Sequence, residues 1–328
     1  MVSSEVEPFS KTGGLADVAG SLPLCLEKLG VEVCIFTPAY RCVLEGNFGL
    51  KRMDRALCVP ISTRRQMAEV LWATVGKGIR CFFLRNDRYY DREYLYGTSD
   101  GDYEDNAERF IFFCRAVPEF IKAYNLQFDI IHCHDWQTAL IPVYLKTLYR
   151  DDPQLKNTAT VFTIHNIGYQ GIFSHYDFHL TGLDWDIFHP GGIEFYGKIN
   201  FLKGGIYFSD VINTVSKKYA QEIQTPEFGF GLDGVLRDRS NELFGITNGV
   251  NYDKWNPEND PYIVAPYNEL TLENKKKCKE DLQRSCGLNV REDVPLVGSI
   301  SRLADQKGFD LVKDCLERMM EMDLQYII

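Results

Sequence analysis

A lysine and two adjacent glycines stand at a predicted bend between a strand and a helix. Lys11 is followed closely by Gly13 and Gly14, and the apolar residues from 15 to 29 recur at helical spacing. Glycine lets a bound group approach the backbone, the first helical turn offers unpaired amides to an anion, and lysine adds a charge that suits phosphate. The pattern indicates an anion site, although an ordinary strand-to-helix turn with a surface lysine would look the same.

Three further polar clusters follow predicted strands. Asp135 comes after the strand 128–133, His165 and Asn166 come after the strand 160–164, and Asn248 comes after the strand 244–247. Open parallel sheets bind ligands at the carboxyl ends of their strands, so we expect these clusters and the lysine–glycine bend to meet at one sheet edge. A helix-capping role for Asp135 stays open beside a ligand contact.

Two cations, Arg302 and Lys307, follow the predicted strand 295–301 and precede a predicted helix. Such a pair suits a diphosphate, although a solvated pair of loop cations would give the same pattern. The run from His132 to His134 invites a metal interpretation. Adjacent strand residues point to opposite faces, however, so Cys133 cannot easily join the two histidines at one ion, and we expect no metal site.

Strands and helices alternate along the chain, which predicts an α/β fold with a parallel sheet. The loop-rich stretch 166–209 is expected to be a long functional loop, and Asp105 is expected to cap a helix. We predict three segments, namely a first domain over 1–250, a linker over 251–270, and the start of a second domain over 271–328. The main expected strands are 31–37, 57–61, 68–75, 79–84, 211–215 and those named above, and the main expected helices are 15–29, 105–124, 137–149, 271–286 and 309–322.

The composition is that of a globular protein, with 45% hydrophobic and 25% charged residues. A formal net charge of −10 argues against a general nucleic-acid partner. No apolar run reaches the length of a membrane span. The ten cysteines form no Cys-x-x-Cys pair, which is typical of reduced thiols in a cytosolic compartment. Both ends are expected to be cut, the carboxyl end more than the amino end.

Two motif searches narrow the possible chemistry. Residues 229–234 match the glycine pattern of a dinucleotide site, but a helix precedes them where that fingerprint requires a strand, so nicotinamide binding is excluded. The sequence also lacks the nucleophile elbow of hydrolases and the phosphate-binding loop of nucleotide triphosphatases. Both of those enzyme classes therefore lose support.

Seven motifs together resemble one known family. Residues 2–18, 103–110, 132–136, 163–171, 226–234, 247–250 and 301–308 are similar, in this order, to motifs of bacterial glycogen synthases and plant starch synthases. The resemblance implies GT-B architecture, in which two Rossmann-like domains flank a cleft. It implies transfer of glucose from ADP-glucose (UDP-glucose in some members) to the non-reducing end of an α-1,4-glucan. It also implies retained anomeric configuration, neither metal nor cofactor, no nucleic acid or membrane partner, and a cytoplasmic location, or the plastid stroma in a plant.

The resemblance also implies roles for individual residues. The bend at Lys11 would lie against the donor diphosphate and glucose, Arg302 and Lys307 would neutralise the departing diphosphate, and His165 would hydrogen-bond the glucose. These four residues form the expected catalytic set. The expected substrate-binding residues are Lys11, Gly13, Gly14, Asp17, Tyr96, Asp135, Asn166, Asn248, Arg302 and Lys307.

Two alternatives accompany this interpretation. The family carries a glutamate motif and a second glycine pair well into its second domain, and the 328 residues contain neither. This departure keeps open a non-catalytic glucan-binding or regulatory paralogue, and it predicts that this polypeptide alone is inactive. A related GT-B transferase, such as sucrose synthase, is the other alternative.

Overall fold

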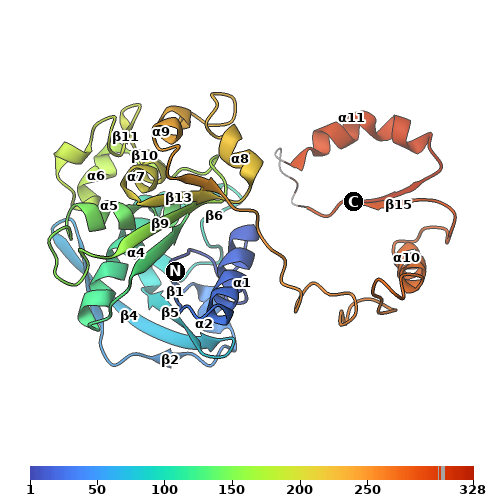
Figure 1. Cartoon of the computed structure of the whole chain (residues 1–328), viewed down its shortest axis with the longest axis horizontal. Helices are drawn as coiled ribbons and strands as arrows, with labels where there is room; N and C mark the ends of the chain where they lie inside the picture. Colours follow the sequence, from blue (N-terminus) through green and yellow to red (C-terminus); the bar gives the residue numbers. More distant parts are fainter. Residues whose placement is uncertain (302, 304–306) are drawn as a thin grey trace. The chain divides into compact units, whose positions relative to one another are not determined.

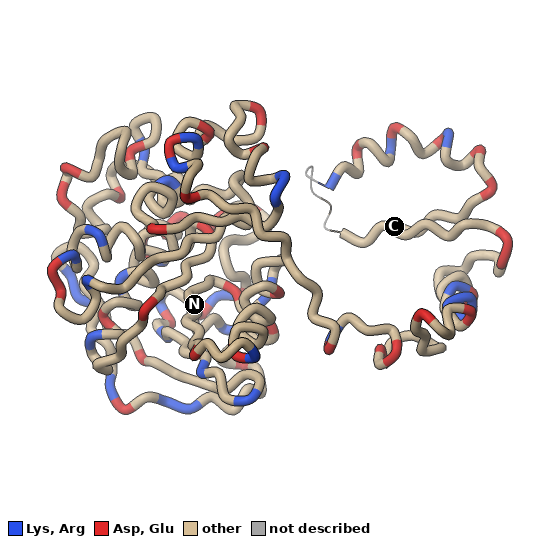
Figure 2. The backbone as a smooth tube through the Cα atoms, viewed as in Figure 1, with Lys and Arg blue, Asp and Glu red and all other residues tan. Residues whose placement is uncertain are grey.

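The computed structural model describes residues 1–301, 303 and 307–328, and the chain divides into two units, Met1–Asn248 and Gly249–Ile328 (Figure 1). Lys and Arg are interspersed with Asp and Glu along the backbone of each unit (Figure 2). Within the described ranges, none of the helices combines the length and the apolar character that a membrane span requires.

The larger unit is built on one sheet whose two halves are joined by the first residues of the chain. Val2 pairs in parallel with Phe36 on one side and with Cys133 on the other. One half runs in the order β1-β5-β4-β2, with β3 paired to β4, and the other runs β8-β9-β13-β14. The strands are β1 (Cys34–Pro38), β2 (Lys51–Arg52), β3 (Leu57–Ile61), β4 (Arg64–Val75), β5 (Ile79–Arg85), β8 (Ile130–His134), β9 (Ala159–Ile164), β13 (Val211–Thr214) and β14 (Leu243–Gly245).

The strands nearest the centre run parallel, as the alternation of elements predicts. β1 pairs in parallel with β5, and β8, β9, β13 and β14 pair in parallel with one another. Within the described strands of this sheet, the antiparallel pairs are those that β4 forms with β2, β3 and β5. Consecutive parallel strands need crossover connections, which here contain helices of the larger unit. These helices are α1 (Gly14–Lys28), α2 (Arg41–Glu45), α3 (Asp87–Tyr90), α4 (Asn106–Ala123), α5 (Leu140–Lys146), α6 (Phe178–Thr181), α7 (Phe201–Phe208), α8 (Lys217–Glu222) and α9 (Asp233–Asp238).

Helix α4 forms much of the core. Phe110, Ile111 and Val117 on one face of the helix are buried, and Phe112 and Phe113 outside that face are buried as well, so most of the helix surface is covered. Asp105 occupies the N-cap position of this helix, as expected, but not with the side-chain hydrogen bond that a cap usually makes. Its side chain makes no cap hydrogen bond and instead accepts two hydrogen bonds from the Arg92 guanidinium, at 2.7 and 2.5 Å. A bidentate arginine pair satisfies a carboxylate better than one backbone amide does.

The stretch 166–209 is not the long loop that its composition predicts. It contains a small antiparallel sheet in the order β10-β12-β11, and it ends in α7. Gly204 and Gly205 disfavour a helix on propensity, but close packing explains them. A Cβ at Gly205 would lie 2.6 Å from Phe162 Cζ, and one at Gly204 would lie 2.8 Å from Ile193 Cγ2. These strands are β10 (Ile172–Ser174), β11 (Glu194–Phe195) and β12 (Lys198–Asn200).

The smaller unit contains one β-α-β arrangement in its described residues. β15 (Leu296–Gly298) pairs in parallel with β16 (Gln325–Ile327), and α11 (Phe309–Met320) lies between them in sequence. The helix α10 (Asn274–Ser285) precedes this arrangement and begins three residues later than predicted from sequence. The expected second α/β segment is therefore present in outline.

Candidate active site

The polar clusters predicted from sequence lie at one edge of the large sheet. Because Val2, β8, β9 and β14 all run in the same direction, the residues that follow them meet at the carboxyl edge. The bend at Lys11, the cluster at Asp135, the pair at His165 and Asn166, and Asn248 all come after these strands. The expected placement at one edge is confirmed for the residues of the larger unit.

The loop of residues 11–14, called the glycine loop below, is held by a carboxylate of the protein itself. Glu5, only 3% exposed, accepts hydrogen bonds at Oε2 from the Thr12 amide (2.5 Å) and the Gly13 amide (3.3 Å). The Thr12 hydroxyl donates to Glu5 Oε1 at 2.6 Å. The amides of Thr12 and Gly13 are therefore already occupied, and both precede the first helical turn.

The two glycines of this loop nevertheless face open space. A Cβ built at Gly13 or at Gly14 would meet nothing within 4 Å. Gly13 has an extended backbone at φ −159°, and Gly14 is the first residue of α1, so neither needs the conformational freedom of glycine. Neither packing nor backbone conformation explains the glycines, which leaves room for a ligand as the physical reason.

Lys11 stands beside this open face in an exposed ion pair. Its Nζ donates to Asp17 Oδ1 at 2.6 Å and lies 3.5 Å from Glu7 Oε2. The hydrogen bond with Asp17 raises the pKa of Lys11, so the lysine is protonated at neutral pH. The structure thus brings together two residues of the predicted site, with Asp17 as the partner that holds the lysine in place.

Tyr96 is joined to the glycine loop through the same glutamate. Its hydroxyl donates to Glu5 Oε1 at 2.7 Å and lies 2.8 Å from the Ser4 hydroxyl. The segment that carries Tyr96 is fixed by Arg109, a fully buried side chain that donates to the carbonyls of Tyr89 (2.7 Å) and Leu95 (2.9 Å). Arg109 was not among the residues predicted from sequence. The signal that could have indicated it is its position in α4, one turn before the apolar Phe113.

Asp135 holds an unusual backbone conformation at the end of β8. Its φ is 56° and its ψ is −178°, a region that only glycine visits readily. Its carboxylate accepts a hydrogen bond from the His165 amide at 2.7 Å, which ties the ends of β8 and β9 together. Burial raises the pKa of Asp135 to about 7, and hydrogen bonds from the backbone amides of His165 and Asn166 oppose this shift. Strain and a perturbed carboxyl pKa in one residue are typical of a functional site.

Three histidine rings lie next to one another at β8 and at the end of β9. The rings of His132 and His134 stack with centroids 4.2 Å apart, and His134 Nδ1 lies 3.0 Å from His165 Nε2. Burial lowers the pKa of His132 to about 3 and that of His165 to about 4, and it lowers the pKa of His134 as well. All three rings are therefore neutral at pH 7. A neutral His165 can accept or donate a hydrogen bond to a sugar hydroxyl without adding charge.

The metal interpretation of this cluster has no geometric support. His132 Nε2 contacts the Thr163 hydroxyl at 2.6 Å, and Cys133 is buried on the other face of the strand. Among residues 1–301, 303 and 307–328, no group of three His, Cys, Asp or Glu side chains is arranged to hold a metal ion.

Two further predicted site residues, Asn248 and Lys307, have exposed side chains. Asn248 is exposed at the end of the larger unit, after β14. Lys307 is exposed in the smaller unit, just before α11. Arg302, the other expected cation, lies outside the described residues. The contacts described above bring together the glycine loop, Tyr96 and the ends of β8 and β9.

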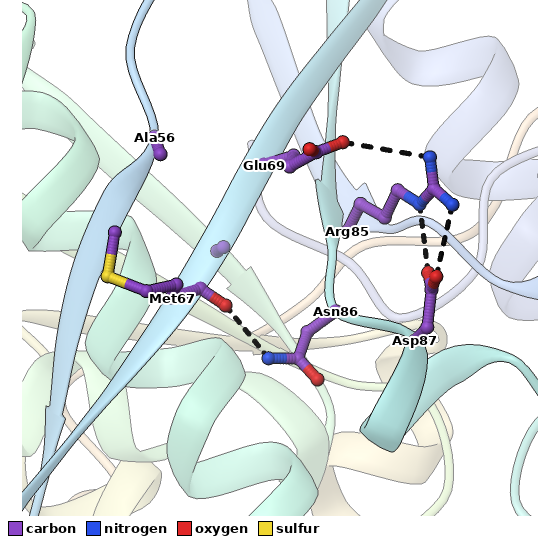
Figure 3. A pocket seen from close by; sticks show the side chains of 7 residues that line it. Ala56, Met67, Glu69, Arg85, Asn86 and Asp87 are labelled. Carbon is purple, nitrogen blue, oxygen red and sulfur yellow. Dashed lines mark hydrogen bonds and ion pairs between the residues drawn. The ribbon is translucent and has the colours of Figure 1, made fainter.

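A surface hollow of about 490 Å³ is lined by residues of β4 and by residues at the end of β5. Its polar groups pair with one another, as Figure 3 shows. Arg85 donates to Asp87 at 2.8 and 3.0 Å and lies 3.6 Å from Glu69, and Asn86 donates to the Met67 carbonyl. None of the predicted site residues lines this hollow, and its paired charges offer little to a ligand.

Comparison with known proteins identifies the family. The family model described as starch synthase catalytic domain matches residues 1–238. The chain belongs to the glycogen and starch synthase family. Glycogen synthases of Pseudothermotoga lettingae and Thermotoga maritima are each 47% identical over 333 residues, an alignment that covers all of this chain and 68% and 67% of theirs. The catalytic domain of starch synthase IV from Arabidopsis thaliana, bound to ADP and acarbose, matches with a TM-score of 0.90 and 33% identity, covering all of this chain and 67% of its own.

Membership of this family confirms several expectations from the sequence. The fold is α/β with parallel sheets and GT-B architecture. The chain is that of a glycosyltransferase that builds glucan by glucosyl transfer. The relatives are named for glycogen and starch, which favours glucan synthesis over transfer to fructose, the activity of the sucrose synthase alternative.

Proposed function

We propose that this synthase transfers glucose from ADP-glucose to the non-reducing end of an α-1,4-glucan, with retained configuration and without a metal or cofactor. The observation that carries the proposal is the open face at Gly13 and Gly14, beside the protonated Lys11 and at the same sheet edge as Asp135 and His165. A site of this kind accepts a sugar and an anion together. The matching starch synthase IV domain binds ADP and acarbose, which fits a nucleotide beside a glucan-like chain.

We propose that the two units bind different parts of the substrates. Residues 1–250 would form the acceptor-side domain, 251–270 the linker, and 271–328 the start of the domain that binds the nucleotide sugar. Lys11 and the glycine loop would contact the diphosphate and glucose, and Arg302 and Lys307 would neutralise the diphosphate as it leaves. His165, Asp135, Asn166 and Asn248 would contact the glucose or the acceptor, with Tyr96 beside them. The free state of all ten cysteines and the bacterial relatives support a cytoplasmic location.

The chemistry of the transfer fits these groups. When the bond from glucose C1 to the diphosphate breaks, negative charge grows on the diphosphate and positive charge grows on the sugar ring. Cations fixed near the leaving group stabilise that charge, and a positioned carboxylate such as Asp135 stabilises the sugar cation. Neutral histidines do not oppose the positive charge on the sugar. Catalysis by this site is therefore mainly electrostatic.

The first test compares donors and acceptors. The intact protein that carries this sequence is expected to move labelled glucose from ADP-glucose into glycogen, with UDP-glucose a poorer donor and fructose no acceptor. Scintillation counting of the precipitated glucan, and chromatography for labelled sucrose, measure both products. Incorporation of label into sucrose instead of glucan would contradict the proposed acceptor. A preference for UDP-glucose would contradict the proposed donor.

A second prediction concerns the open face of the glycine loop. Gly14→Ala is expected to leave stability unchanged or raise it slightly, because alanine favours the first helical turn by about 0.5–1 kcal/mol. The same variant is expected to lower kcat/KM for ADP-glucose by about tenfold or more, because its methyl group fills the space that we assign to the ligand, a loss of about 1.4 kcal/mol or more. Thermal unfolding and initial rates measure the two effects.

Gly20→Ala is the matched control in the same helix. A Cβ there would lie 2.4 Å from the Glu7 carbonyl oxygen, so this variant is expected to lower the melting temperature. If Gly14→Ala kept the full catalytic rate, the open face would not be the donor site.

A further inference from the structure

We propose that Glu5 is a positioning residue for the transfer reaction. Its carboxylate locks the glycine loop to Tyr96 and so fixes the open face of Gly13 and Gly14 before a donor arrives. The inference rests on the proposed function for its catalytic consequence, but its structural part does not. Glu5 is not among the residues that the sequence motifs or the family resemblance assign to the site.

The hydrogen bonds of Glu5 fill the whole carboxylate. Oε2 accepts from the Thr12 amide (2.5 Å) and the Gly13 amide (3.3 Å), and Oε1 accepts from the Thr12 hydroxyl (2.6 Å) and the Tyr96 hydroxyl (2.7 Å). An ionised carboxylate offers about four acceptor directions, all of which are used here. Glu5 has no lone pair left for a substrate, so it acts through the groups that it holds.

The surroundings of Glu5 explain why a side chain with hydrogen-bonding oxygen atoms is needed at this position. At 3% exposure it is buried, and none of the cations in the described residues forms an ion pair with it. A buried charge without hydrogen bonds would cost several kcal/mol, and the four donors supply the compensation. Four hydrogen-bond donors converge on the two oxygen atoms of one side chain. Only an acidic side chain, or an amide of the same shape, can satisfy them.

The position of Glu5 links the two halves of the site. Glu5 comes three residues after Val2, which lies in the centre of the sheet. Its carboxylate binds both the glycine loop, which follows it closely in sequence, and Tyr96, which is far away in sequence. Its negative charge also acts on the pKa of Asp135 and on the pKa of His165, raising both. The Glu5 carboxylate therefore joins the glycine loop to Tyr96 by direct hydrogen bonds, and its charge acts on the two strand ends.

The decisive experiment compares Glu5→Gln, Glu5→Ala, Tyr96→Phe and the double variant Glu5→Ala/Tyr96→Phe in the intact protein. Glutamine keeps one acceptor oxygen for the two loop amides, and its NH₂ group can donate to the hydroxyls of Thr12 and Tyr96, which are free to rotate. Glu5→Gln should therefore keep kcat/KM for ADP-glucose within about threefold of wild type, and Glu5→Ala should lower it about thirtyfold, a difference of about 2 kcal/mol. The KM for glycogen should change less than twofold, which a general loss of structure would not produce.

The double variant and a ligand-free measurement complete the test. Tyr96→Phe should have a clearly smaller effect in the Glu5→Ala background than in wild type, because its hydrogen bond to Glu5 is already gone and only the contact with the Ser4 hydroxyl remains to be lost. Amide hydrogen exchange, followed without any ligand, should show Thr12 and Gly13 protected in wild type and in Glu5→Gln but not in Glu5→Ala, with Glu45→Gln as an exposed control. Additive effects of the two substitutions, or equal exchange in all proteins, would overturn the inference. Intact amide protection in a wild-type protein without transferase activity would instead contradict the proposed function alone.

Discussion

Lys11→Ala is expected to lower the rate of glucosyl transfer by about 10²–10³-fold, the effect of removing one fixed charge-stabilising group from a transition state. Its ion pair with Asp17 is about 38% and 39% exposed at the two side chains, so it contributes only about 0–1 kcal/mol to stability. The free energy of unfolding should therefore hardly change. A large loss of rate without a loss of stability would identify Lys11 as part of the site and not of the fold.

Two further variants sharpen this prediction. Lys11→Arg keeps the charge but replaces a point charge with a planar fork, so it should recover only part of the rate. Lys77→Ala, in the exposed turn between β4 and β5, removes an equal charge far from the site and should behave as wild type. Radiolabel transfer and urea denaturation measure rate and stability. A Lys11→Ala protein within threefold of the wild-type rate would show that the assignment is wrong.

Asp135→Asn is expected to raise stability and lower activity at the same time. Asparagine keeps the amide oxygen that can accept from the His165 amide, and it tolerates the positive φ of this position. It cannot ionise, however, so it loses the negative charge that we assign to stabilising the sugar cation. A loss of about 10²-fold in kcat, or about 2.7 kcal/mol of transition-state stabilisation, is expected.

The stability gain depends on pH in a defined direction. The folded-state pKa of Asp135 is raised to about 7, whereas the unfolded value is about 3.9. The folded protein holds this proton more tightly, so the contribution of Asp135 is fully favourable below about pH 4 and is lost as pH rises to about 7. Asparagine avoids that loss. The gain of Asp135→Asn should therefore be a few kcal/mol at pH 8 and clearly smaller at pH 5.

The difference in the free energy of unfolding between Asp135→Asn and wild type isolates the contribution of Asp135. The buried histidines lose stability as pH falls below about 6.5, because their pKa values are lowered in the folded state, but this effect is common to both proteins. Asp129→Asn, exposed at the opposite end of the same strand, is the control and should show no such pH dependence. Guanidinium denaturation at the two pH values gives the comparison. An equal gain at pH 5 and pH 8 would contradict a buried, ionising Asp135.

Local sequence signals were sufficient for the parallel strands and for the placement of the polar clusters. Asp135, His165 and Asn248 could be placed because each follows an apolar run, and parallel strands bring such residues to one edge. Glu5 carries no comparable signal. Its importance depends on Thr12 and Tyr96, and the contact with Tyr96 exists only in the folded chain.

The failures have identifiable physical causes. The helix that ends the 166–209 stretch was missed because Gly204 and Gly205 lower helix propensity, while close contacts with Ile193 and Phe162 favour small residues there. Asp105 occupies the cap position that a local rule predicts, but its side chain binds a distant partner, Arg92, instead of a backbone amide. In each case tertiary packing decided between two local possibilities.

The pairing of Val2 with both halves of the sheet has a consequence for how the site forms. Residue 2 fills the central position, but its partners are residues 36 and 133, so the centre of the sheet closes only after a long stretch of chain has been ordered. Such non-local contacts raise the contact order and slow folding, because the entropy of loop closure is lost before the contacts form. Glu5 and the glycine loop follow directly from this central residue. We therefore expect the glycine loop to become ordered together with the middle of the sheet. The site would then form late in folding.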